Sequence, residues 1–210
     1  MTTISEFTKT ELLSLKLYKT PIKVIPNPLT ISFQYSPKLD WSYKVKILHV
    51  GTKENKNLIR LTKALNGVNC FLTIIGKLNS EQEFYLNTNN IDYINKINVS
   101  ESELKEEYKL CDLLAFVSTY EGFGLPIIEA QALGRVVLAS NISSIPEIAG
   151  DGAYLVDPYS VDQIKDAILY LSKNRNVRLR LIENGKVNVE RFRPELIAEM
   201  YNKLYMKVGA

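Results

Sequence analysis

The chain has 210 residues, of which 46% are hydrophobic and 23% are charged. These proportions are ordinary for a folded globular protein and argue against disorder as its main state. The formal net charge of +3 is too small to indicate binding to nucleic acid or to an anionic membrane surface. No apolar run approaches the roughly 20 residues of a transmembrane helix, and the first residues lack the pattern of a signal peptide.

The cysteines and the histidine further limit the kinds of site that the chain can form. The chain contains two cysteines, Cys70 and Cys111, at the edges of apolar runs, which is typical of buried side chains in a reducing compartment. His49 is the single histidine, and its apolar surroundings predict a packing role. We therefore expect no metal and no cofactor, and a cytoplasmic protein with at most peripheral contact to the inner face of the membrane.

Residues 1–43 follow no regular pattern. Ser5 is placed to cap a short helix, Ile22–Ile25 is a short apolar run, and 30–43 is typical of an irregular linker. The helix carries four leucines, Leu12, Leu13, Leu15 and Leu17. Two interpretations stay open at this point: the segment is the end of a preceding domain joined by a hinge, or it is the decorated N-terminus of a single-domain protein.

From residue 44 onward, apolar runs alternate with helical patterns. The predicted strands are Val45–Val50, Cys70–Ile75, Ile91–Ile97, Leu113–Val117, Val136–Ala139 and Ala153–Val156. The predicted helices are 57–65, two that begin with capping-box spacing at Ser80 and Ser100, one that begins at Pro126, and then 161–172, 176–189 and 195–206. This order predicts an α/β fold, a doubly wound Rossmann-like parallel sheet over 44–190 with extra C-terminal helices.

The loop from Ser118 to Glu129 is the strongest candidate for a ligand site, because ligands of open α/β sheets bind beyond the carboxyl ends of the strands. It turns through Gly122 and Gly124, where backbone can approach a ligand closely, and enters a helix at Pro126. The free N–H groups at a helix start form an anion site that suits a diphosphate.

Glu121 and Glu129 lie in the same loop, although carboxylates repel phosphate. Ionised carboxylates accept hydrogen bonds from sugar and ribose hydroxyls, so the combination predicts a nucleotide diphosphate sugar. The alternative is that Glu129 only favours the start of a helix and that the glycines only make a turn.

Two further loops offer weaker evidence. Lys56 follows Gly51 and lies near a helix N-terminus, where its positive charge opposes the helix dipole. An anionic ligand would make this position favourable, although a solvated lysine explains it equally well. Val99, just before a capped helix, is placed either for a backbone contact with a base or in an ordinary turn.

These loops carry a resemblance to a known family. The segment YEGFGLPIIEA, from Tyr120 to Ala130, resembles the E-x7-E signature of the retaining glycosyltransferases of group 1, also called family 4. Other stretches with the same resemblance are ISEFTK from Ile4, VIPNP from Val24, ILHVGT from Ile47, LCDLLAFVS from Leu110, ALGRVVLAS from Ala132 and SIPEIAGDG from Ser144. The first two resemble the end of the family's first domain and its interdomain hinge.

The resemblance implies one half of a GT-B fold, in which two Rossmann-like domains face a cleft. The family's C-terminal domain binds the nucleotide sugar and its N-terminal domain binds the acceptor, without a metal. Residues 1–43 would then be a remnant of the N-terminal domain plus hinge, 44–190 the nucleotide-sugar-binding domain, and 191–210 a helix crossing toward the missing domain.

Motif matching also implies site residues. Glu121 would hold the transferred sugar as the catalytic residue, Glu129 the ribose hydroxyls, and Lys56 the diphosphate. The remaining implied contacts are Gly51 and Thr52 in the lysine loop, Gly124, Leu125 and Pro126 near the phosphates and sugar, and Val99 near the base. Thr52 stands where many members have an arginine, Val136 replaces a common proline, and His49 does not match the family's donor-facing histidine.

The expected function is the donor half of a retaining glycosyltransferase that transfers a hexose from a UDP- or GDP-linked sugar to a glycan or lipid-linked acceptor. The alternatives are a non-catalytic nucleotide-sugar-binding module and a truncated or split-gene fragment that is inactive alone. A separate N-terminal domain subunit or self-association is expected to cover the apolar residues of the first helix and of the last, namely Leu196, Ile197, Met200 and Leu204.

Overall fold

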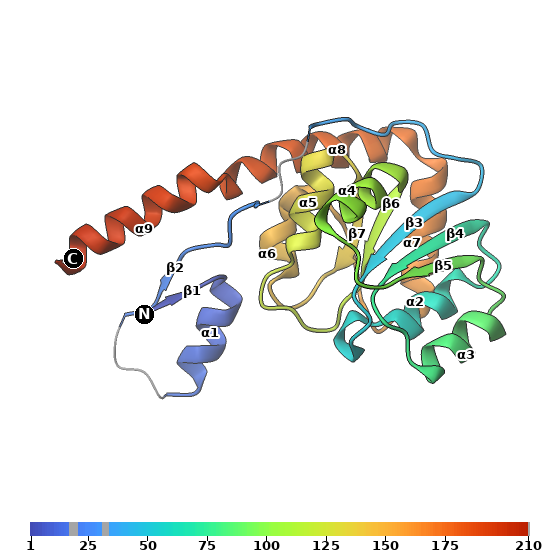
Figure 1. Ribbon diagram of the computed structural model, residues 1–210, viewed down its shortest axis with the longest axis horizontal. Coiled ribbons are helices and arrows are strands. Elements are labelled where there is room, and N and C mark those ends of the chain that lie inside the picture. The colour runs from blue at the N-terminus through green and yellow to red at the C-terminus, as the bar shows by residue number, and fades with distance from the viewer. Residues whose placement is uncertain (17–20, 31–33, 210) are drawn as a thin grey trace.

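The computed structural model describes residues 1–16, 21–30 and 34–209. Its centre is a six-stranded sheet in the order β5-β4-β3-β6-β7-β8, with every neighbouring pair parallel (Figure 1). The strands are β3 (Val45–Val50), β4 (Cys70–Ile75), β5 (Tyr93–Lys96), β6 (Leu113–Phe116), β7 (Val136–Ser140) and β8 (Tyr154–Val156). The predicted doubly wound Rossmann-like fold is confirmed, and its strand order reverses between β3 and β6.

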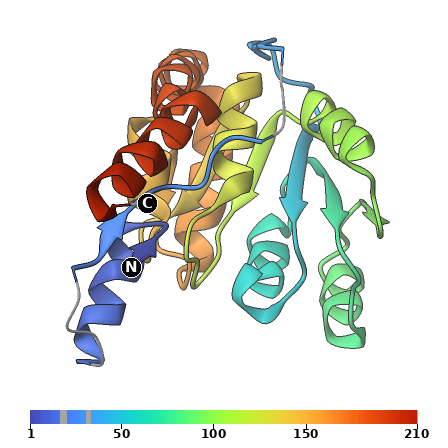
Figure 2. The same ribbon diagram turned by 60° about the vertical axis from the view of Figure 1, so that its left-hand side comes forward.

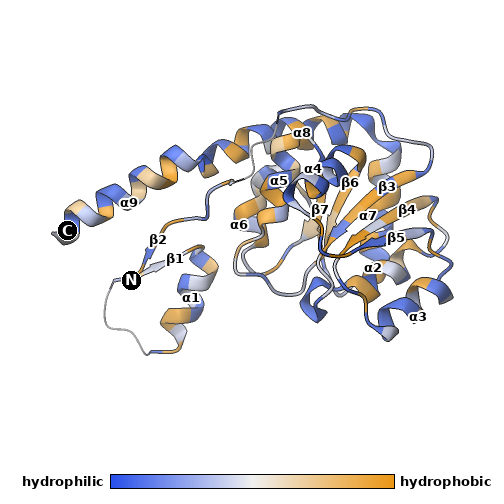
Figure 3. Cartoon of the chain, in the orientation of Figure 1, coloured by the Kyte–Doolittle hydropathy of each residue, from blue (hydrophilic) through white to orange (hydrophobic). Residues whose placement is uncertain are grey.

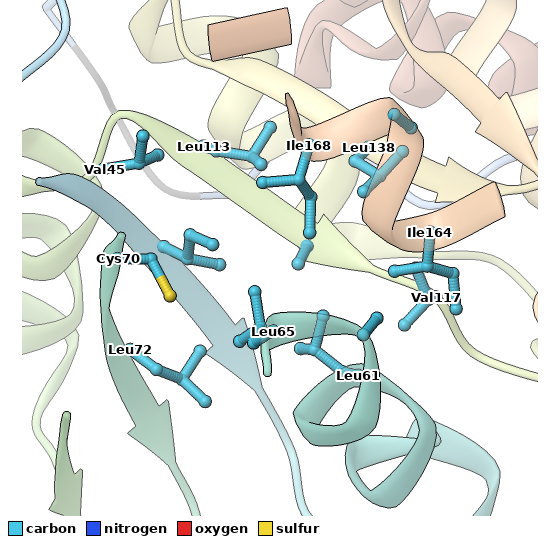
Figure 4. Close-up of a cluster of buried hydrophobic side chains, with 14 of the residues drawn as sticks. Val45, Leu61, Leu65, Cys70, Leu72, Leu113, Val117, Leu138, Ile164 and Ile168 are labelled. Atoms are coloured by element: carbon cyan, nitrogen blue, oxygen red, sulfur yellow. The ribbon is translucent and has the colours of Figure 1, made fainter. Parts of the chain in front are cut away.

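Helices cover both faces of the sheet. They are α2 (Leu58–Leu65), α3 (Ser80–Thr88), α4 (Glu101–Leu110), α5 (Leu125–Leu133), α6 (Ile145–Ala149), α7 (Val161–Lys173) and α8 (Arg175–Val189). One core cluster joins the sheet to α2, α3 and α7, with part of α8, and the other joins it to α4, α5 and α6. Figure 4 shows the first cluster, where Leu61 and Leu65 of α2 and Ile164 and Ile168 of α7 gather over the strands.

Burial on both faces explains the nearly continuous apolar runs of the strands. Ile47 belongs to the first cluster and its neighbour Leu48 to the second, because successive side chains of a strand point to opposite faces. Both side chains are almost fully buried, and the same alternation holds for Leu113 and Leu114 on β6.

Side-chain caps fix where the helices begin. The predicted capping box of Ser100 and Glu103 is confirmed at the start of α4. The box predicted at Ser80 is wrong by one residue, since Asn79 caps α3 and exchanges hydrogen bonds with Gln82. Asparagine is a strong N-cap and glutamine reaches back as well as glutamate does, so this earlier pair takes the position.

The N-terminal segment lies beside the last helix, at one end of the molecule (Figures 1 and 2). Strand β1 (Thr2–Thr3) pairs in parallel with β2 (Lys23–Val24), and between them α1 (Glu6–Ser14) is capped by Ser5, as predicted. Helix α9 (Pro194–Val208) follows η3 (Glu190–Phe192) and projects from the sheet.

Hydrophobic residues occur along both α1 and α9 (Figure 3), and on each helix some of their side chains are exposed. Leu13 is 49% exposed and Leu196 is 44% exposed. The expectation that Ile197 is uncovered is wrong, because it is 3% exposed in the first turn of α9, where this helix contacts η3. The predicted position Leu17 lies outside the described residues.

Candidate functional site

The loops that follow β3 and β6 meet at the point where the strand order reverses. The backbone N–H of Thr119 donates to the carbonyl of Asn55 at 2.8 Å, and the Asn55 amide donates to the carbonyl of Tyr120 at 2.9 Å. Asn57, which has a φ of 64°, ties the start of α2 to β6 by donating to the carbonyl of Val117 at 2.8 Å. Two loops that are far apart in sequence therefore form one surface at the carboxyl ends of the strands.

Lys56 and Glu121 form an ion pair on this surface. The Lys56 Nζ lies 2.6 Å from Glu121 Oε1, and the two side chains are 19% and 14% exposed. The lysine also lies over the ring of Phe116, 4.8 Å from its centroid. The two residues that sequence matching assigns to diphosphate and sugar are thus direct neighbours, and the Glu121 carboxylate occupies the place where we expected an anionic ligand.

The loop of Glu121 is held by serines that sequence analysis did not identify. The Ser144 hydroxyl donates to the carbonyls of Glu121 and Phe123 at 2.8 and 2.9 Å, and the Glu121 N–H donates to Ser143 Oγ at 3.2 Å. Hydroxyls that satisfy the loop's own backbone keep Glu121 in a defined position when no ligand is bound.

Gly124 turns this loop into α5. Its φ is 123°, a conformation that other residues rarely adopt, and it is the N-cap residue of the helix. Leu125 and Pro126 are the first two helical residues, one position earlier than the predicted start at Pro126. The N-terminus of α5, with its free N–H groups, therefore lies directly after the Glu121 loop.

Gly51 and Thr52 form the other side of the surface. Gly51 has a φ of 95°, and a side chain there would meet Lys56 Cε at 2.9 Å, so the lysine stem crosses this glycine. The Thr52 hydroxyl donates to the carbonyl of Lys77 at 2.6 Å, and the Thr52 carbonyl accepts from the Gln82 amide at 2.7 Å. Thr52 thus ties the loop after β3 to the loop after β4.

Glu129 lies one turn into α5 and is 7% exposed. Its Oε2 accepts a hydrogen bond of 2.7 Å from the hydroxyl of Tyr108 on α4. Burial raises the pKa of Glu129 above its ordinary value, and the bond from Tyr108 opposes that rise. Sequence analysis gave Tyr108 no role, although a buried tyrosine hydroxyl needs a polar partner.

Val99 and His49 lie at the edges of the site. Val99 is partly buried against the second core cluster, directly before the cap of α4. His49 is 1% exposed, with its Nδ1 3.1 Å from the carbonyl of Ala115. Burial lowers the pKa of His49 to about 4, so the ring is neutral at pH 7, in agreement with a packing role.

The N-terminal segment contacts the same loop. The hydroxyls of Ser5 and Thr8 donate to the carbonyl of Gly122 at 2.9 and 3.3 Å. Glu147 on α6 accepts from the backbone N–H groups of Glu6 and Phe7, so it caps α1 from outside that helix. None of these contacts follows from a local sequence pattern.

In the ranges 1–16, 21–30 and 34–209, no group of three His, Cys, Asp or Glu side chains is arranged to hold a metal ion. No helix in that part of the chain is long and apolar enough to cross a membrane.

The family described as "Glycosyl transferases group 1" matches residues 37–188 of this chain. The chain belongs to the group 1 glycosyltransferases. Within this family it resembles the O-antigen chain mannosyltransferase B of Escherichia coli, with 35% identity over 94 residues, 45% of this chain and 25% of the relative.

Solved glycosyltransferase structures have the same fold. Sucrose-phosphate synthase from Thermosynechococcus elongatus superposes with a TM-score of 0.85 and 21% identity, covering 99% of this chain and 57% of that one. HepE of Anabaena, solved in complex with UDP and glucose, superposes with a TM-score of 0.77 and 17% identity, covering 100% and 62%. The match therefore spans about a quarter of the curated relative and about three fifths of these two structures.

Proposed function

We propose that this chain is the donor-binding half of a retaining hexosyltransferase that uses a UDP- or GDP-linked sugar. The observation that carries the proposal is the meeting of Lys56 and Glu121 beside the N-terminus of α5. This arrangement combines a cation and helical N–H groups for a diphosphate with a carboxylate for sugar hydroxyls.

Each residue then has a distinct role. Lys56 leaves Glu121 and pairs with the diphosphate, while Glu121 accepts hydrogen bonds from the transferred sugar. Glu129 accepts the ribose hydroxyls. The backbone of Gly51, Thr52, Gly124, Leu125 and Pro126 lies near the phosphates and sugar, and Val99 lies near the base. The charges of Lys56 and the α5 N-terminus stabilise the leaving diphosphate, so the proposal includes no metal.

Transfer proceeds with retention of the anomeric configuration. The bond from the anomeric carbon to the diphosphate oxygen breaks, and the acceptor oxygen bonds to that carbon on the same face. The acceptor proton moves to the departing phosphate. The named activity of the Escherichia coli relative supports a glycan or lipid-linked acceptor in cell-surface polysaccharide synthesis.

Isothermal titration calorimetry of the 210-residue chain with UDP, GDP and their hexose conjugates tests donor binding. We expect saturable binding of one nucleoside diphosphate series, together with a rise in the thermal midpoint as the ligand concentration increases. Absence of binding across both series at millimolar ligand would contradict the proposal.

We further propose that transfer requires an acceptor-binding domain, either as a separate subunit or as further sequence. The exposed leucines of α1 and α9, among them Leu13 and Leu196, support a surface that another domain or a second copy covers. Without a second wall, the reacting oxygen is exposed to water, and positioning of the acceptor is lost. We expect negligible product from donor sugars and a broad acceptor panel. Efficient turnover by a monomer would refute this part.

A further inference from the structure

Tyr108 joins two elements of the candidate site. It is fully buried on α4, and its hydroxyl donates to Glu129 Oε2 on α5 at 2.7 Å. We propose that Tyr108 is a positioning residue that holds the Glu129 carboxylate ionised and aimed at the ribose of the donor. This inference rests on the proposed function, in which Glu129 accepts the ribose hydroxyls.

The hydrogen bond assigns different tasks to the two carboxylate oxygens. Tyr108 engages Oε2, so in this proposal Oε1 is the oxygen that accepts from the ribose. Because the Tyr108 side chain is fully buried, it does not touch the donor itself, and in this proposal it acts through the Glu129 carboxylate. A carboxylate fixed by a buried donor loses less freedom on binding a diol than one that is free to rotate.

Helix α4 is itself anchored at both ends. At its start, Val99 packs against the same core cluster that contains Tyr108. At its end, Arg135 is 4% exposed and donates to the carbonyls of Tyr108 and Lys109 at 2.8 and 3.0 Å. One helix therefore sets the distance between the proposed base contact and the group that holds the ribose acceptor.

The hydrogen bond also opposes the effect of burial. Burial raises the pKa of Glu129 and Glu101 on α4 adds to the rise, whereas the bond from Tyr108 lowers it. Cys111, just beyond α4, donates from its thiol to the Tyr108 backbone carbonyl at 3.3 Å. Loss of the hydroxyl therefore makes Glu129 take up a proton at a higher pH, and binding that needs the ionised form is lost at that higher pH.

A ligand comparison separates this role from a structural one. The probes are UDP and GDP, each compared by calorimetry with its 2′,3′-dideoxy form. We expect Tyr108→Phe to weaken the ribose form about threefold to tenfold while leaving the dideoxy form unchanged. The loss of ribose affinity on acidification moves to higher pH. Adding Tyr108→Phe to Glu129→Gln weakens binding no further.

Tyr35→Phe is the matched control, because it removes a tyrosine–glutamate hydrogen bond to Glu183 on α8. It should leave all four affinities unchanged. Equal losses for ribose and dideoxy forms in Tyr108→Phe, or no loss, would overturn the inference while the proposed function stands. If the unmodified chain binds neither UDP nor GDP, the proposed function fails and this inference fails with it.

A second measurement uses the unmodified chain, so it does not depend on whether a variant folds. A buried tyrosine hydroxyl that is bonded to a carboxylate exchanges its proton slowly, so it gives an observable proton resonance. In the unmodified chain, the Tyr108 resonance should shift on binding the ribose form and shift much less with the dideoxy form. Equal shifts with both forms would overturn the inference.

Discussion

Glu121 and Glu129 belong to one loop-and-helix segment, but the fold gives their carboxylates opposite surroundings. Glu121 lies in the loop, where Lys56 balances its charge at 2.6 Å. Glu129 lies one turn into α5, where it is 7% exposed and accepts a hydrogen bond from the neutral hydroxyl of Tyr108. The Glu121 carboxylate is paired with a cation. The Glu129 carboxylate accepts from a neutral donor, and its burial removes most of its contact with water.

The difference indicates how each carboxylate meets a donor. In the proposed function, Lys56 would pair with either Glu121 or a diphosphate, so binding would exchange one partner for another and offset part of the gain. Glu129 would keep its partner when a ribose binds, so it would act as a preformed acceptor. The two ends of the motif should therefore respond differently to the same type of substitution.

The largest expected effect on donor affinity comes from replacing Lys56, which pairs with Glu121 and, in the proposed function, with the diphosphate. Lys56→Met should weaken UDP or GDP binding about tenfold to a hundredfold, because a hydrogen bond to a charged group is worth roughly 1.5–3 kcal/mol. Lys46→Met, at the opposite end of β3, is the control and should have no effect. Calorimetry that gives equal affinities for the Lys56 variant and the unmodified chain would remove Lys56 from the site.

An intermediate effect is expected on the stability of the fold. Burial holds the pKa of Glu129 above its ordinary value, so the unfolded chain releases this proton at lower pH and ionisation then favours unfolding. Glu129→Gln does not titrate. Relative to this variant, the unmodified chain should lose stability as the pH rises from about 4.5 until Glu129 is ionised. Above that pH the variant's thermal midpoint, relative to that of the unmodified chain, should be higher than it is at pH 4.

Thermal unfolding at several pH values measures this difference directly. A difference between the two midpoints that does not change with pH would refute the idea that burial of this carboxylate costs stability.

The smallest expected effect is an increase in ligand affinity, opposite to the loss expected for the Lys56 variant. Glu121→Gln frees Lys56 from its ion pair, so free UDP or GDP should bind about threefold more tightly. Glu129→Gln, in contrast, should bind both more weakly. If both glutamine variants shift calorimetric affinity in the same direction, the two carboxylates do not differ in the way their surroundings imply.

Local patterns predicted the sheet and the positions of the ligand loops, because strand periodicity and glycine turns are properties of short segments. The predicted runs at 45–50 and 70–75 coincide with β3 and β4. The Lys56–Glu121 and Tyr108–Glu129 pairs were not predicted, since they join residues 65 and 21 positions apart. Such contacts depend on how loops and rotamers meet after the sheet has formed. Whether the implied site residues bind a donor stays a prediction.

The contacts of the N-terminal residues determine how far the chain can be shortened without disturbing the Glu121 loop. The Gly122 carbonyl accepts from Ser5 and Thr8, and the Glu147 carboxylate accepts from the first N–H groups of α1. The Ser36 carbonyl likewise accepts from Arg135 at 2.6 Å. A chain shortened to begin at residue 44 would lose all of these partners, including two that hold the backbone next to Glu121. A transplant of the sheet into another scaffold that preserves this loop must therefore carry the described N-terminal residues with it.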